Sequence, residues 1–99
     1  MYTSRMKSAS MDRLFAALLT LKTEEEYYRF FEDLCTVAEL QAMAQRLHVA
    51  EMLKQNITYT SIAEETGAST ATVSRVKKAL NYGADGYKLV LERLNNIEG

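Results

Sequence analysis

The chain has 99 residues, which fits one small domain, because single domains usually run from about 50 to 200 residues. Hydrophobic residues make up 47% of it and charged residues 25%, the composition of a folded globular protein rather than a disordered one. One cysteine and one histidine exclude an internal disulfide and argue against a structural metal site. No apolar run approaches the roughly 18 residues that a membrane span needs, and a signal-peptide pattern is absent, so we expect a cytoplasmic protein with no membrane partner.

Charge is segregated along the chain, although the net charge is only −1. Residues 1–23 carry a net charge of +3, residues 24–39 carry −5, residues 40–65 carry −1 and residues 66–94 carry +3, while Glu98 supplies the last −1. Local potential, more than total charge, decides which charged partner a surface attracts. The two basic segments therefore favour an anionic polymer as a partner.

Helix signals recur along the chain, whereas strand alternation, Asn-Gly turns and proline are absent. Residues 1–9 are expected to form a flexible arm. Ser10 is placed to cap a first helix, and Thr23 with Glu26 forms a capping box that opens a second one. The apolar stripe predicted for the first helix consists of Leu14, Phe15, Leu18, Leu19 and Leu21.

The second helix is aromatic on more than one face, because it carries Tyr27, Tyr28, Phe30 and Phe31. Such a helix is either sunk in the core of its own chain or sandwiched between two protomers. A chain of this length has a thin core of its own. The sequence therefore favours the second alternative, an obligate homodimer whose interface resembles a core.

A longer third helix is predicted between Thr36, which forms a second capping box with Glu39, and Asn56. Its expected apolar face consists of Leu40, Met43, Leu47, Ala50 and Leu53.

Three shorter helices follow: one over 60–66, one over 69–81 after a turn at Gly67, and one after Asp85. The sequence thus predicts an all-α fold of six helices. We expect residues 10–99 to form a single domain. Its parts are dimerisation helices over 10–56, a helix-turn-helix over 58–81 and a C-terminal helix over 85–98.

The segment 59–78, YTSIAEETGASTATVSRVKK, has the spacing of a helix-turn-helix. Ala63 is small enough for two helices to cross closely, and Gly67 supplies the positive φ that the turn needs. The inner face is predicted to bury Ile62, Ala68, Val73 and Val76.

The outward face of the second helix in this motif combines short polar side chains with cations. Hydroxyl and methyl groups can meet base edges in a major groove, whereas Arg and Lys meet phosphates. We expect Thr70, Ala71 and Ser74 to touch bases and the cations to anchor the helix on double-stranded DNA. The candidate DNA-binding residues are Thr60, Ser69, Thr70, Ala71, Thr72, Ser74, Arg75, Lys77 and Lys78.

Three other interpretations compete with DNA recognition. The hairpin could present a face that is merely solvated, or it could act as an adaptor that docks a protein. An enzyme is disfavoured, because the chain has no phosphate-binding glycine loop, no metal pair and no nucleophile beside a base. We therefore name no catalytic and no metal-binding residue.

From about Leu34 to Leu94 the chain also resembles the Trp repressor superfamily, and most closely its Trp-repressor-like YerC/YecD family, and the run over 34–80 carries the resemblance. The resemblance lies in Thr36 at the head of the long helix, in Gln45-Arg46 inside it, and in GASTATVSR, which begins at Gly67. It implies an intertwined, all-helical bacterial dimer that acts as a transcriptional repressor of an amino-acid-related operon. The two reading helices would then lie about 34 Å apart on a two-fold symmetric operator.

The resemblance also implies an amino-acid effector site, formed here by Thr36, Arg46, Thr72 and Arg75. Two departures from the repressor pattern argue against tryptophan. Val76 replaces a glycine beneath the indole, and Ala79 replaces a serine near the ligand's amino group. Added volume and a lost polar partner each cost about 1–3 kcal/mol. We expect no cofactor, and leave open a different small amino acid or no effector at all.

The two arginines of this site have simpler alternatives. Arg75 can serve only as a phosphate clamp, and Arg46 can pair with Asp33 or Glu39.

Overall fold

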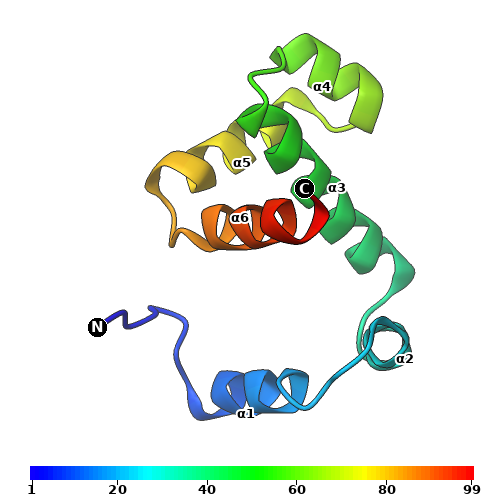
Figure 1. Ribbon diagram of the computed structural model, residues 1–99, viewed down its shortest axis with the longest axis vertical. Coiled ribbons are helices and arrows are strands. Elements are labelled where there is room, and N and C mark those ends of the chain that lie inside the picture. The colour runs from blue at the N-terminus through cyan, green and yellow to red at the C-terminus, as the bar shows by residue number, and fades with distance from the viewer. The chain divides into compact units, whose positions relative to one another are not determined.

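The computed structural model describes all 99 residues and contains six helices and no strand, which confirms the all-α prediction (Figure 1). The helices are α1 (Ala9–Leu18), α2 (Glu24–Leu34), α3 (Val37–Lys54), α4 (Tyr59–Thr66), α5 (Thr70–Tyr82) and α6 (Gly86–Glu98). The chain divides into two compact units, residues 1–37 and residues 38–99. No helix is both long enough and apolar enough to cross a bilayer.

The first helix begins earlier than the sequence predicts, because Ser8 and not Ser10 is its N-cap. The Ser8 backbone is extended, and its Oγ accepts a hydrogen bond from the backbone N–H of Met11 at 3.1 Å. Ser10 lies inside the helix, where its Oγ is 3.2 Å from that of Ser8. The predicted stripe is also too long, since α1 ends at Leu18 and Leu21 lies beyond it.

The capping box of α2 is confirmed, with one change of partner. Thr23 Oγ1 accepts from the backbone N–H of Glu26 at 3.2 Å, as expected. The Glu26 carboxylate accepts in return from the N–H of Lys22, at 2.8 Å, rather than from that of Thr23. The motif therefore fixes the residue that leads into the helix as well as the helix start.

No residue of the unit 1–37 is buried. In α2 the ring of Phe31 stacks on that of Tyr27, with centroids 6.3 Å apart, and meets Phe30 edge-on at 6.1 Å. These rings contact one another, but none of the three side chains is buried. Large apolar side chains exposed in this unit are Met1, Tyr2, Met6, Phe15, Leu19, Tyr27, Tyr28, Leu34 and Val37.

The core lies wholly in the unit 38–99 and joins its four helices. Tyr87 and Leu91 of α6 pack against this core from the side. The buried residues are Val49, Ala50, Met52, Leu53, Ile62, Ala68, Val73, Val76 and Leu80.

The predicted apolar face of α3 is only partly correct. Ala50 and Leu53 are buried, but Leu40 and Leu47 are half-buried and Met43 remains 39% exposed. A helix turns once every 3.6 residues, so Ala50, seven residues after Met43, lies on the same face as Met43. The buried residues therefore differ from the others in their position along α3, since all four lie between Val49 and Leu53. This chain's core thus covers only the C-terminal part of α3 and leaves the apolar side chains nearer its start partly exposed.

Residues in the left-handed region end two of the helices of this unit. Asn56, with φ of 60°, follows α3, and Gly67, with φ of 74°, ends α4, both as predicted. The last helix begins directly after Asp85, as expected, although Asp85 has a φ of 64° and makes no capping hydrogen bond. A side chain at Gly83 would collide with the carbonyl oxygen of Ala79, so only glycine fits at the end of α5.

Candidate nucleic-acid interface

The hairpin of α4 and α5 has the geometry of a helix-turn-helix. The N–H of Gly67 donates to the carbonyl of Ala63 at 2.9 Å, which closes α4 with a left-handed residue. Two residues later Ser69 caps α5, because its Oγ accepts from the N–H of Thr72 at 3.1 Å. The chain therefore passes from α4 to α5 through a turn of three residues, as is typical of this motif.

The inner face of the hairpin is the one predicted from the sequence. Ile62, Ala68, Val73 and Val76 are all buried, and Leu80 extends their row by one more turn. These side chains fix which face of α5 meets the core. The opposite face of α5 is consequently left to solvent.

That solvent face combines small residues with cations. Ala71, Ser74, Arg75, Lys78 and Tyr82 follow one another at spacings of one, three and four residues along α5, on the side away from Val73. All five of these side chains are exposed. We call this set the α5 outer face. Its small residues come first along the helix and its cations later.

The cations of α5 have no partner within the chain. Arg75, Lys77 and Lys78 take part in no ion pair. The chain's three ion pairs join Lys7 to Asp12, Arg29 to Glu25 and Lys88 to Asp85. The positive charge of α5 is therefore fully available to an anionic partner, although Lys77 is half-buried.

The other predicted DNA-binding residues divide into two groups. The hydroxyls of Ser69 and Thr72 bond each other at 3.1 Å, and Ser69 also caps the helix, so these two residues hold the start of α5 in place. Thr60, Thr70 and Ser74 are exposed, and their hydroxyls make no hydrogen bond in the chain.

Sequence reasoning did not include Tyr82 in the candidate interface. Two tyrosines, Tyr82 and Tyr87, flank the turn after α5, and each is close enough in sequence to α6 to pack against it. The structure gives that role to Tyr87, which lies against the core, while Tyr82 is 83% exposed. The spacing of the sequence could have indicated this position, because Tyr82 follows Lys78 by four residues and so lies on the same face of the helix.

The residues implied as an effector site are distributed over both units. Arg46 and Thr72 are half-buried, Arg75 is exposed, and Thr36 belongs to the unit 1–37. Arg46 takes part in none of the three ion pairs given above, and its suggested pairing with Asp33 or Glu39 stays a prediction.

Val76, which the resemblance places where an indole would lie, is 1% exposed and belongs to the core, while Ala79 is half-buried.

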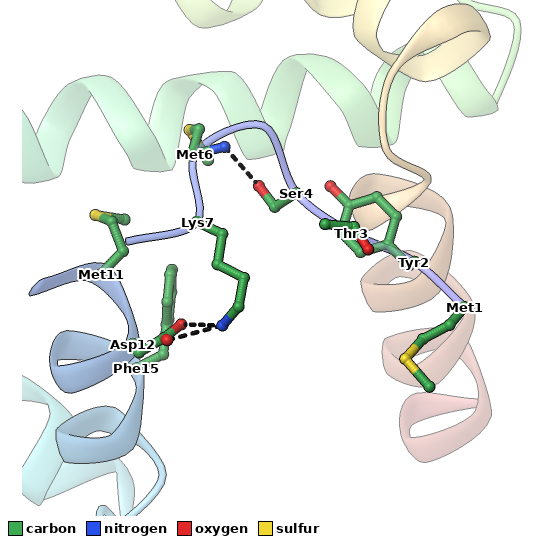
Figure 2. Close-up of a pocket in the computed structure, with 9 residues that line it drawn as sticks. All are labelled: Met1, Tyr2, Thr3, Ser4, Met6, Lys7, Met11, Asp12 and Phe15. Atoms are coloured by element: carbon green, nitrogen blue, oxygen red, sulfur yellow. Dashed lines mark hydrogen bonds and ion pairs between the residues drawn. The ribbon is translucent and has the colours of Figure 1, made fainter. Parts of the chain in front are cut away.

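The first unit contains a hollow of about 340 Å³ between the N-terminal segment and α1 (Figure 2). Met1, Tyr2, Met6 and Phe15 supply much of its apolar lining. Its charged groups neutralise each other, since Lys7 Nζ lies 2.7 Å from an Asp12 carboxylate oxygen. No group of three or more metal-binding side chains occurs in the chain.

The reversed helix pair, its buried inner face and its cationic outer face together define a helix-turn-helix protein. The sequence profile of the Trp repressor protein family matches residues 9–95. The chain therefore belongs to the Trp repressor family, as its sequence resemblance suggested. Members of this family regulate transcription and are not enzymes.

Several relatives support this assignment. The chain is 52% identical over 98 residues to YerC of Bacillus subtilis, a protein of uncharacterized function, covering 99% of this chain and 94% of YerC. It is 34% identical over 80 residues to a Trp operon repressor homolog of Chlamydia caviae, covering 80% and 79% of the two chains.

Two crystal structures have the same fold. A TrpR-like protein of Eubacterium eligens superposes with a TM-score of 0.88 at 53% identity, over 92% of this chain and 94% of that one. A candidate Trp repressor of Staphylococcus aureus superposes with a TM-score of 0.87 at 54% identity, over 92% and 91% of the two chains.

Proposed function

We propose that this protein is a sequence-specific regulator of transcription that binds double-stranded DNA as a homodimer. Each protomer inserts one α5 into a major groove of a two-fold symmetric operator, and binding represses an amino-acid-related operon. A regulator of this kind works where bacterial DNA is, in the cytoplasm. The observation that carries the proposal is the α5 outer face, whose unpaired cations lie beside small side chains on the side opposite the core.

The chemistry of this face suits a duplex. Arg75 and Lys78 can neutralise phosphates, and phosphate contacts supply most of the affinity of such proteins. Ala71, Ser74 and Thr70 are short enough to let the helix approach base edges closely. No side chain on this face is obviously placed for a bidentate base contact, so part of the specificity comes from bridging waters and from DNA shape.

The first unit supports the homodimer. Residues 1–37 have no buried residue and expose a row of large apolar side chains. A soluble monomer rarely leaves so much apolar surface uncovered. A second copy of the chain would cover it, and would set two reading helices about one DNA turn apart, on the order of 34 Å.

Tryptophan is not the effector in this proposal. The buried Val76 side chain occupies space that the ligand's ring would need, and Ala79 has no hydroxyl to offer an amino group. The repressor activity is supported by the family and by the Chlamydia caviae relative, which is named a Trp operon repressor homolog.

The salt dependence of DNA binding tests the proposal. We expect the association constant for a duplex selected from random DNA to fall steeply as the salt concentration rises. A plot of its logarithm against the logarithm of the salt concentration should have a slope near −0.9 for each phosphate that the protein neutralises. Arg75→Gln and Lys78→Gln should each flatten that slope. Lys88→Gln is the matched control, because Lys88 sits on α6 and is already paired with Asp85. Weak binding without salt dependence would favour the protein-docking adaptor instead.

A further inference from the structure

One hydrogen bond ties the turn of the helix-turn-helix to the long helix α3. The side-chain amide of Gln45 on α3 donates from Nε2 to the backbone carbonyl of Thr66, the last residue of α4, at 3.1 Å. The two residues are 21 positions apart, whereas the side-chain bonds within α1, α2 and the hairpin join residues at most five apart. Both residues are half-buried, which shields the bond from water.

Thr66 is bonded in three ways at once. Its carbonyl accepts from Gln45, its Oγ1 donates to the carbonyl of Ile62 at 2.7 Å, and the same oxygen accepts from the N–H of Ala68 at 3.1 Å. The last carbonyls of any helix lack partners within the helix. Gln45 satisfies one of these at the point where the chain leaves α4.

The position of this bond matters because the turn begins at the next residue. Gly67 reverses the chain and Ser69 starts α5, so the direction of α5 depends on how the end of α4 is held. Apolar contacts alone hold two helices together without fixing their angle closely, because they are not directional. A hydrogen bond to a backbone carbonyl adds a directional restraint.

We propose that Gln45 is a positioning residue for DNA recognition: its amide anchors the turn to α3 and so sets the angle at which α5 is presented. Gln45 itself does not touch the duplex. The DNA-binding part of this inference rests on the proposed function, and the anchoring part does not.

Two variants remove the donor while keeping the side-chain length. Gln45→Met replaces the amide with an apolar chain, and Gln45→Glu replaces it with a carboxylate, which cannot donate. Gln41 offers a matched control, since it is exposed on the same helix one turn earlier and makes no hydrogen bond. Gln41→Met and Gln41→Glu change composition and net charge identically.

The informative quantity is the ratio of specific to non-specific DNA affinity. Losing one hydrogen bond should weaken specific binding by a factor of about five for each reading helix, and so by about 25 for two. Non-specific affinity and the salt slope should stay the same, because phosphate contacts tolerate small changes of angle. The Gln41 variants should bind both kinds of duplex as the parent does.

Three results would overturn the inference. A flatter salt slope in Gln45→Met would mean that Gln45 contacts phosphate directly. Equal losses of specific and non-specific affinity, or loss of folding in both Gln45 variants, would make it a residue of general stability. Unchanged specific affinity would mean that it positions nothing.

Hydrogen exchange without DNA separates this inference from the proposed function. The amide hydrogens of Gly67 and Ala68 should exchange faster in Gln45→Met than in the parent, and at the parental rate in Gln41→Met. If the parent protein binds no specific duplex, the proposed function fails, while exchange at the turn still reports on the anchor. Unchanged exchange at both amides would disprove the anchor itself.

Discussion

Individual residues of α5 divide the work of binding DNA in this account. Cations such as Lys78 attract any phosphate backbone, while short side chains such as Thr70 lie where base edges differ. The cations therefore affect the affinity for every duplex, whereas the short side chains affect the preference for one base sequence over another. Ser69 and Thr72 serve neither purpose directly, because their hydroxyls already hold the start of the helix.

Replacement of Lys78 and of Thr70 should separate these two effects. Lys78→Ala is expected to weaken binding to every duplex by the same factor and to reduce the salt slope by about one per lost phosphate contact. Thr70→Ala is expected to change the ranking of duplexes instead, by about 1–3 kcal/mol at the affected base pair. Fluorescence anisotropy on a panel of single-base variants measures both. The same uniform loss in the two variants would contradict the division of labour.

The proposal that tryptophan is not the effector depends on a single core residue at this scale. Val76 is 1% exposed, so an aromatic ligand could enter only by displacing the core. Calorimetric titration with tryptophan should therefore show no binding with a dissociation constant in the micromolar range. Tight binding of tryptophan would show that Val76 moves aside, and our exclusion of this ligand would be wrong.

At the scale of elements, the turn between α4 and α5 depends on one left-handed residue. Gly67 has a φ of 74°, and a Cβ added there would meet no atom within 4 Å. Any cost of a side chain at this position is therefore conformational rather than steric. For residues with a Cβ that cost is about 1–2 kcal/mol.

Gly67→Ala should thus lower the free energy of unfolding by about 1 kcal/mol. Gly86→Ala is the control, because a Cβ at Gly86 is equally unobstructed but the backbone there does not have a positive φ. That replacement should be neutral or stabilise α6 by up to about 1 kcal/mol. Chemical denaturation of both variants checks the contrast, and equal effects would show that φ at Gly67 is not the cause.

The elements that sequence predicted well are those fixed by local chemistry. The turn at Gly67, the exit at Asn56 and the inner face formed by Ile62 and Val73 follow from backbone preference and helical spacing. The candidate DNA-binding face follows from the same spacing, because burying one side of α5 exposes the other.

Other features could not be read from local signals. Ser8 and Ser10 are chemically equal as caps, and only the backbone path decides between them. The anchor from Gln45 to Thr66 joins residues 21 positions apart, which no local pattern reveals. On α3, Met43 lies on the same face as the buried Ala50, so periodicity cannot tell how far along the helix this chain's own core extends.

At the scale of the whole molecule, a single chain leaves many of its large apolar side chains exposed. All nine buried residues lie between Val49 and Leu80, while α2 and the part of α3 before Val49 contain no buried residue. Obligate dimers often have interfaces that resemble a core divided between two chains. The stability of such a protein depends on its concentration.

The thermal midpoint should therefore rise with protein concentration, and sedimentation should give a dimer at micromolar concentrations. Tyr28→Glu should disrupt the dimer, although Tyr28 is 63% exposed in the single chain, because it would bury a charge in the interface. Tyr82→Glu, at an even more exposed tyrosine on α5, should leave the dimer intact and weaken DNA binding by repelling phosphates. A monomeric parent protein would contradict this part of the account.

The central claim is that the outer face of α5 lies against a duplex, and backbone amide NMR tests it most directly. Titration with a duplex selected from random DNA should shift the amide signals of residues 69–78 first and most strongly. The signals of residues 89–97 on α6 should move little. Shifts confined to other surfaces, or no shifts at all with duplex DNA in excess, would contradict the assignment of this face to DNA recognition.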